Sequence, residues 1–113
     1  MKDCIFCKIV EKKLPANIIF EDEYFLAFHD IKPAAPVHLL LIPKKHIESL
    51  KSTHQHDEIW LGKMLLLIPK IAFNNGCKSG IDGGFRIVNN CGTAAGQEVP
   101  HLHFHILGGF VSS

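Results

Sequence analysis

The residues of this chain with the clearest capacity for chemistry are three histidines at alternate positions, His101, His103 and His105. Successive side chains of a β-strand point to opposite faces of the sheet. In a strand, the three imidazoles would therefore share one face, about 7 Å apart, while Leu102 and Phe104 would fill the other face against a core. One strand would then gather three titratable nitrogen bases in one place.

Such a group of imidazoles suits two kinds of chemistry. Histidine is a common ligand of zinc, and histidines at positions i and i+2 can chelate one ion. Neutral imidazole is also a competent nucleophile near neutral pH, because its reference pKa is about 6.5. The spacing alone leaves open metal binding, nucleophilic catalysis and a set of buried core histidines.

The loop directly before the histidines, residues 90–97, is rich in small residues. Small side chains let backbone N–H groups approach an anion closely, and Asn90 and Gln97 add side-chain donors. An anion held beside a histidine nucleophile would describe phosphoryl or nucleotidyl transfer through a phospho-histidine.

The elements that must position these residues follow from the hydrophobic pattern. Apolar runs predict strands, and apolar residues at helical spacing from Asp57 to Ile71 predict a helix. Ser52 and Gln55 resemble a capping box for this helix, and Pro69 is expected to kink or split it. Strands before and after a helix predict an α+β fold with an antiparallel sheet. The predicted strands are 18–20, 24–28, 37–43, 85–89 and 101–107.

The predicted helix is apolar over more of its surface than one small sheet needs. Leu61, Leu65, Leu66 and Ile68 widen the apolar face. A helix of this kind in a small domain indicates a second contact surface, most simply between two subunits.

Composition limits the class of protein. The 113 residues predict one domain, 1–113, with a real core. A net charge of +1, from 12 basic and 11 acidic residues, argues against a broad nucleic-acid-binding surface. No signal peptide is visible, and the longest apolar run is too short to span a membrane. We therefore expect a cytoplasmic protein with reduced cysteines or cysteine metal ligands.

Taken together, several stretches resemble the histidine-triad (HIT) superfamily. The pattern His-φ-His-φ-His-φ-φ is met at residues 101–107, and the further matches are residues 3–9, 27–31, 38–46, 95–99 and 108–109. The resemblance is closest to the Hint branch of nucleoside phosphoramidases. It implies a five-stranded antiparallel sheet with two helices, extended across a homodimer, that acts on a purine nucleotide and releases AMP or GMP.

The resemblance also implies residue roles. The middle histidine, His103, would attack the α-phosphorus and form a nucleotidyl-histidine, and no catalytic metal would be needed. His101, His105 and His38 would flank the phosphate, and Asp30 would bind the ribose hydroxyls. The base would be held by Ile5, Phe6, Ile9, Phe28, His29 and Ile31. The phosphate and leaving group would be held by Asn90, Gly96, Gln97 and the N–H of Val99.

A separate signal is the CxxC motif formed by Cys4 and Cys7. It resembles the N-terminal pair of bacterial HIT proteins that carry a structural zinc, in which case His46 and His101 would be the other ligands. Two cysteines and two histidines form a sound zinc set. Two free thiols packed near the core are the alternative.

Three other functions stay open at this point. One is a different HIT reaction, such as hydrolysis of dinucleoside polyphosphates. Another is a non-catalytic nucleotide-binding dimer, against which the complete triad argues. The third is a metallohydrolase with the triad as its ligands, which would lose activity in the presence of a chelator.

Overall fold

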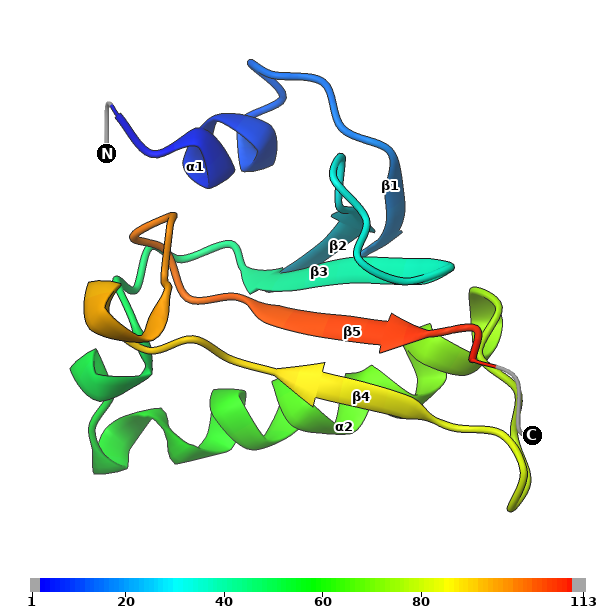
Figure 1. Cartoon of the computed structure of the whole chain (residues 1–113). Helices are drawn as coiled ribbons and strands as arrows, with labels where there is room; N and C mark the ends of the chain where they lie inside the picture. Colours follow the sequence, from blue (N-terminus) through cyan, green and yellow to red (C-terminus); the bar gives the residue numbers. More distant parts are fainter. Residues whose placement is uncertain (1–2, 111–113) are drawn as a thin grey trace.

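The computed structural model describes residues 3–110, which form one five-stranded antiparallel sheet in the order β1-β2-β3-β5-β4 and two helices (Figure 1). This architecture confirms the expected α+β fold. The helices are α1 (Ile5–Val10) and α2 (Glu58–Asn74). The strands are β1 (Ile18–Glu21), β2 (Phe25–His29), β3 (Val37–Pro43), β4 (Phe85–Val88) and β5 (Phe104–Gly108). Among residues 3–110, no helix is long and apolar enough to cross a membrane.

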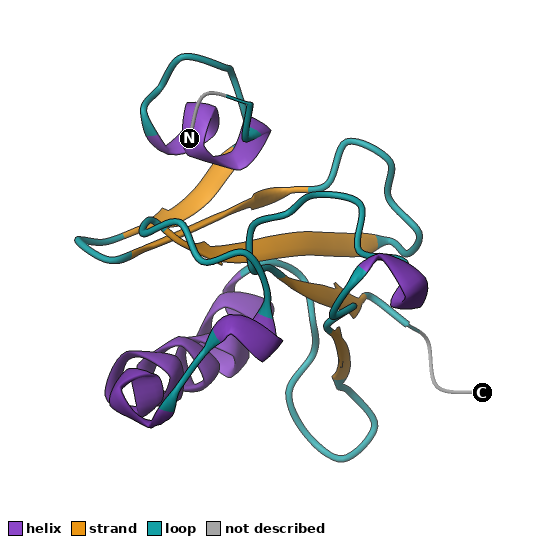
Figure 2. Ribbon diagram, turned by 90° about the vertical axis from the view of Figure 1, so that its left-hand side faces the viewer, coloured by secondary structure: helices purple, strands orange, loops and turns teal. Residues whose placement is uncertain are grey.

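The two helices cover opposite faces of the sheet (Figure 2). Each face therefore has its own buried apolar cluster. The cluster under α2 comprises Phe25, Ala27, Leu39, Leu41, Met64, Ile68, Ile71, Ala72, Cys77, Leu102, Phe104 and Ile106. The cluster under α1 comprises Cys4, Phe6, Cys7, Ile9, Leu26, Phe28, Leu40 and Ile42.

Strand alternation decides which side chains reach which face. On β3, Leu39 and Leu41 pack toward α2, whereas Leu40 and Ile42 pack toward α1. His38 has the same parity as Leu40 and therefore lies on the α1 face. Phe104 and Ile106 of β5 belong to the α2 cluster, so the odd-numbered histidines of that segment are directed to the α1 face. The register of the sheet thus brings the histidines of two strands to one side.

The histidine strand is shorter than predicted. Its ladder begins at Phe104, where Leu41 pairs with Phe104, so His101 and His103 precede it. The N–H of Leu102 bonds instead to the carbonyl of Ile47, at 2.6 Å. The segment stays extended enough for Leu102 to reach the α2 core, but its hydrogen bonds go to a loop.

The cap predicted for α2 was wrong. Ser52 and Gln55 do not cap it, because each lies in a separate 3-10 turn before the helix. The carboxylate of Asp57 accepts the N–H of His54 at 2.8 Å and the indole N–H of Trp60 at 2.8 Å, which holds the entry to the helix. The helix is also continuous through Pro69 rather than split.

The surplus apolar surface of α2 is smaller than expected. Ile68 is fully buried in the core. Leu65 and Leu66 are exposed at 45% and 79%, so the unpaired apolar surface lies on their side of the helix.

Candidate active site

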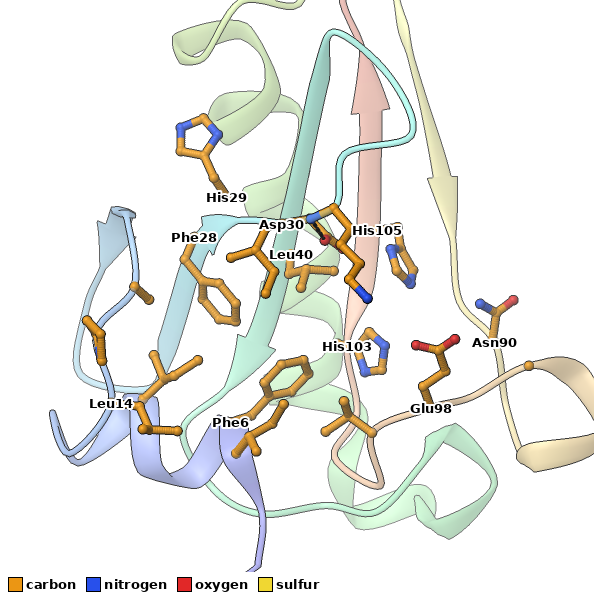
Figure 3. A pocket seen from close by; sticks show the side chains of 18 residues that line it. Phe6, Leu14, Phe28, His29, Asp30, Leu40, Asn90, Glu98, His103 and His105 are labelled. Atoms are coloured by element: carbon orange, nitrogen blue, oxygen red, sulfur yellow. Dashed lines mark hydrogen bonds between the residues drawn. The ribbon is translucent and has the colours of Figure 1, made fainter.

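A cavity of about 710 Å³ lies over the α1 face of the sheet, a size typical of sites for small ligands (Figure 3). It combines an apolar wall with a group of polar residues. The apolar lining residues are Ile5, Phe6, Ile9, Leu14, Pro15, Ala16, Phe28, Ile31, Leu40 and Val99. The others are His29, Asp30, Lys32, Asn90, Gly96, Glu98, His103 and His105.

His103 is held in one tautomer by the backbone. Its Nδ1 lies 2.7 Å from the carbonyl oxygen of His101. A carbonyl only accepts hydrogen bonds, so Nδ1 carries the proton and Nε2 keeps a free lone pair. The ring of Phe6 packs edge-on against His103 with centroids 5.1 Å apart, and Asn89 donates to the His103 carbonyl at 2.9 Å. The imidazole is thus fixed with a nucleophilic nitrogen available in the cavity wall.

A chain of hydrogen bonds fixes His105 in the other tautomer. The N–H of Ala34 donates to Nδ1 of His38 at 2.9 Å, so the His38 proton is on Nε2. That proton is donated to Nδ1 of His105 at 2.9 Å, with Oδ2 of Asp30 3.4 Å away. His105 therefore carries its own proton on Nε2. His38 does not line the cavity itself and acts through the His105 ring.

Burial favours the neutral form of His105. Desolvation is the main cause that lowers its pKa, and the neighbouring His103 and His38 lower it further. Asp30 and Glu98 oppose the shift. A neutral imidazole with its proton on Nε2 is a hydrogen-bond donor without a permanent charge.

His101 does not line the cavity. It is fully buried, and its Nε2 donates to the carbonyl of Pro43 at 2.8 Å. Its Nδ1 therefore has a free lone pair, which faces Cys4 Sγ at 3.3 Å and Cys7 Sγ at 3.6 Å. Burial lowers the pKa of His101 to about 4, so the ring is neutral at physiological pH.

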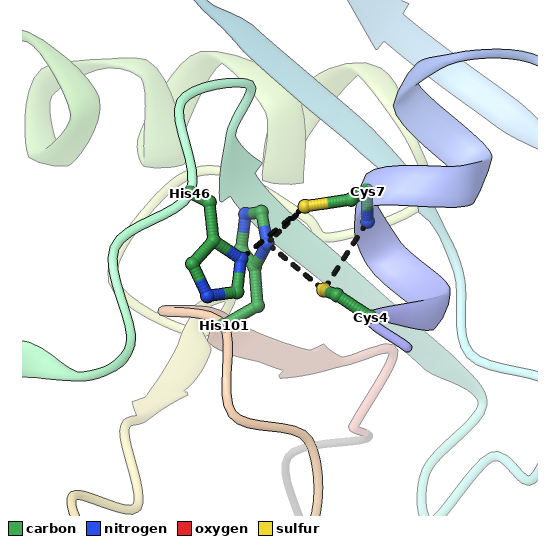
Figure 4. A group of neighbouring side chains, drawn as sticks. All are labelled: Cys4, Cys7, His46 and His101. Atoms are coloured by element: carbon green, nitrogen blue, oxygen red, sulfur yellow. Dashed lines mark hydrogen bonds between the residues drawn. The ribbon is translucent and has the colours of Figure 1, made fainter. Parts of the chain in front are cut away.

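Cys4, Cys7, His46 and His101 form a cluster whose ligand atoms all lie within 4.8 Å of one another (Figure 4). The Sγ of Cys7 is 3.2 Å from Nδ1 of His46. Zinc bonds of about 2.3 Å to sulfur and about 2.0 Å to nitrogen would separate tetrahedral S and N ligands by about 3.5 Å. The observed distances are close to that value, so these four residues can hold one metal ion.

The environment of the Cys7 thiol favours its protonated form. Burial raises the pKa of Cys7 to about 11, and its interaction with Cys4 adds to the rise. A bound cation would displace the Cys7 proton, because thiolates are the species that ligate metals.

The loop before the histidines is braced by Gln97. Its Oε1 accepts the N–H of Gly92 at 2.8 Å, and its Nε2 donates to the carbonyls of Glu48 at 2.7 Å and Val99 at 3.0 Å. These bonds direct the Gln97 side chain away from the cavity lining, which differs from the sequence prediction. Gly96 does line the cavity, with a φ of 92° that disfavours any residue with a Cβ.

Most of the other residues predicted for the site do lie together in the structure. The sequence prediction also missed some residues that belong to the site. All six residues predicted for the base line the cavity, with Asp30, Asn90 and Val99. Sequence reasoning missed Glu98 and Lys32 in the lining, and Asn89 as a support of the His103 backbone. Glu98 lies two residues before Pro100, within residues 95–99, which the sequence analysis had already named. A charged residue so close in sequence to the histidines was the signal that could have indicated its place in the site.

Comparisons with known proteins show the family of this chain. The sequence model of the HIT domain family matches residues 11–111 of this chain. The chain is 49% identical to protein HitA of Neisseria gonorrhoeae over 108 residues, which cover 96% of this chain and 97% of HitA. It is 43% identical to a HIT family hydrolase of Legionella pneumophila, with a TM-score of 0.89 and coverage of 98% and 96%. A histidine triad protein of Clostridium difficile is 44% identical, with a TM-score of 0.89 and coverage of 97% and 93%.

Proposed function

This chain belongs to the HIT domain family, and we propose that it is a nucleoside phosphoramidase that works through a nucleotidyl-histidine. The observation that supports this best is the tautomer of His103, whose Nδ1 donates to a carbonyl so that Nε2 faces the cavity with a lone pair. The description of the Legionella relative as a hydrolase supports hydrolysis in general. We further propose that residues 1–113 form a single HIT domain, and that its free cysteines fit a reducing compartment such as the cytoplasm.

The cavity offers distinct places for the parts of a purine nucleotide. The apolar end, with Phe6 and Phe28, suits a flat base. The carboxylate of Asp30 lies between that end and the histidines (Figure 3), where it can accept hydrogen bonds from the ribose hydroxyls. Its Oδ1 accepts the N–H of Lys32 at 2.8 Å, which fixes the carboxylate in place. The α-phosphate would then lie beside His103.

The reaction has two displacements at the α-phosphorus. In the first, Nε2 of His103 forms a bond to phosphorus, the P–N bond to the leaving amine breaks, and the amine takes up a proton. In the second, water attacks phosphorus and gives up a proton, which balances the proton taken by the amine, the P–N bond to His103 breaks, and the nucleoside monophosphate leaves. The N–H of His105 can stabilise the phosphoryl oxygens in both steps. His38 is a positioning residue, because it fixes the tautomer of His105.

We propose that Cys4, Cys7, His46 and His101 hold a structural zinc. Such an ion would tie the start of α1 to the segment that leads into the catalytic strand. His101 then supports structure, while its carbonyl oxygen orients His103 at 2.7 Å. The three histidines of the motif would thus have three different tasks.

Release of AMP from an adenosine phosphoramidate tests the proposed activity. We expect turnover by the purified chain, and we expect a brief treatment with EDTA to leave the initial rate within about twofold, because the nucleophile is an imidazole. Chromatography of the products would measure AMP. Absence of turnover would contradict the phosphoramidase proposal, and immediate loss of turnover with EDTA would favour a metallohydrolase.

We also propose that two chains pair through α2 and β4, which extends the sheet across the dimer. Strand β4 is at an edge of the sheet. Both elements carry exposed apolar side chains, with Ile59 at 72% and Leu66 at 79% on α2 and Ile87 at 45% on β4. Exposed apolar patches of this kind mark interaction surfaces, and an open strand edge can pair with a second copy.

Sedimentation at micromolar concentration is expected to give about 25 kDa, twice the chain mass of 12.6 kDa. Leu66→Glu should shift the protein toward monomer, because it would bury a charge in an apolar contact. Tyr24→Glu is the matched control, since Tyr24 is 59% exposed near the opposite sheet edge and should leave the dimer intact. A monomeric wild-type protein would refute the dimer.

A further inference from the structure

The cavity has a definite order from one end to the other (Figure 3). Phe6 and Phe28 lie at one end, and His103 lies near the middle. Glu98 and Asn90 lie at the end beyond His103. If the base and ribose occupy the apolar end and the α-phosphorus lies against His103, the leaving amine departs from the face of phosphorus opposite Nε2 of His103. The end with Glu98 and Asn90 is then the part of the cavity left to hold this amine.

The negative charge of Glu98 is electrostatically unfavourable at this end of the cavity, beside the expected position of the phosphate. Its carboxylate is directed into the cavity beside His103 and His105 (Figure 3), close enough to oppose the lowering of the His105 pKa. Within residues 3–110, no hydrogen bond or ion pair of its side chain is found. A carboxylate beside the position of an anionic phosphate raises the electrostatic energy of the complex, unless the substrate brings a positive charge.

Within residues 3–110, no lysine forms an ion pair with the carboxylate of Glu98. Lys32 lines the cavity and its backbone N–H donates to Asp30 Oδ1, but no ion pair between its ammonium and Glu98 is found among residues 3–110. The ammonium of Lys51 lies beside Gly92, 3.2 Å from the position of a Cβ there, and Lys51 does not line the cavity.

We propose that Glu98 selects the charge of the leaving amine, so that phosphoramidates of cationic amines react faster than those of anionic amines. This rests on the proposed phosphoramidase activity and adds the class of substrate to it. The same carboxylate would disfavour leaving groups that are themselves anions, such as nucleotides and polyphosphates. Charge selection at an exposed carboxylate also weakens with salt, because the interaction is screened within about 10 Å at 0.1 M.

The test uses three adenosine phosphoramidates with the same two-carbon linker on the leaving nitrogen. The linker ends in a trimethylammonium group, a tert-butyl group or a sulfonate, which differ mainly in charge. The quantity measured is kcat/KM for each substrate with the wild-type protein and with Glu98→Gln. Because each comparison uses one substrate on two proteins, the intrinsic reactivity of the leaving group cancels.

We expect Glu98→Gln to reduce the ratio of cationic to anionic kcat/KM by about tenfold, and we expect 0.5 M salt to reduce the wild-type ratio in the same direction. Glu23→Gln, an equal change of charge at an exposed position outside the cavity lining, should leave the ratio within about twofold.

Each other outcome overturns the inference. A ratio that Glu98→Gln leaves within twofold, with all three substrates still hydrolysed, would refute charge selection while leaving the phosphoramidase activity intact. A uniform loss with all three substrates would assign proton transfer to Glu98 instead. Failure of the wild-type protein to hydrolyse any of the three would refute the proposed function, and charge selection with it.

Discussion

His103→Ala is expected to lower kcat for an adenosine phosphoramidate by at least about 10³-fold, which corresponds to roughly 4 kcal/mol in the activation barrier. The variant lacks the nitrogen that forms the bond to phosphorus, and neither His101 nor His105 can replace it. The Nδ1 of His101 faces the two thiols, and the Nδ1 of His105 accepts the proton of His38. Steady-state release of AMP measures the effect.

The loss of kcat identifies the nucleophile only if the His103→Ala variant remains folded. His103 is 6% exposed and contacts Phe6, so AMP binding by calorimetry should accompany the kinetics and should persist. His56→Ala is the matched control, because the His56 side chain is 75% exposed and should retain wild-type turnover. A rate for His103→Ala within tenfold of wild type would be incompatible with a histidine nucleophile at this position.

The double substitution Cys4→Ser with Cys7→Ser is expected to remove one zinc per chain and to lower the melting temperature by about 10 °C or more. A ligand bound only by the folded state adds to the free energy of unfolding, and a few kcal/mol correspond to shifts of this size in a domain of about 100 residues. Metal analysis of protein purified without chelator and a thermal unfolding curve provide the two measurements.

Cys91→Ser is the control for the loss of a thiol, since Cys91 is only partly buried and lies outside the cluster. The double variant should keep measurable catalysis while it is folded. A wild-type protein with no metal and an unchanged melting temperature after exposure to chelator would disprove the structural zinc. Complete inactivity of a folded double variant would instead favour the metallohydrolase.

The parts of the fold with long regular patterns could be predicted from sequence. Strand β3 was predicted at its observed bounds, Val37–Pro43, because a largely apolar run that starts after Pro36 and ends at Pro43 leaves little freedom. The alternation of His101 to Phe104 also predicted which face the histidines would occupy. Which of these residues pair with the neighbouring strands could not be predicted, because the hydrogen bond from Leu102 to Ile47 depends on a loop far away in sequence.

Other features depended on contacts that no local pattern carries. Helix α1 has only six residues, too few for a periodic signal, and its start is fixed by Cys4 Sγ accepting the N–H of Cys7 at 3.3 Å. The side chain of Gln97 was predicted to meet the ligand, but three hydrogen bonds within the protein use it. Whether a loop amide faces inward or outward depends on partners such as Glu48, which only the tertiary structure places.

The stereochemical course at phosphorus tests the nucleotidyl-histidine most directly. The substrate would be an adenosine phosphoramidothioate of known configuration at phosphorus, hydrolysed in ¹⁸O-labelled water, and the configuration of the product would be determined. Two successive in-line displacements, first by Nε2 of His103 and then by water, each invert the centre, so our account predicts net retention. This measurement does not require the intermediate to accumulate. Net inversion would mean that water attacks the substrate directly, and it would contradict the covalent role of His103.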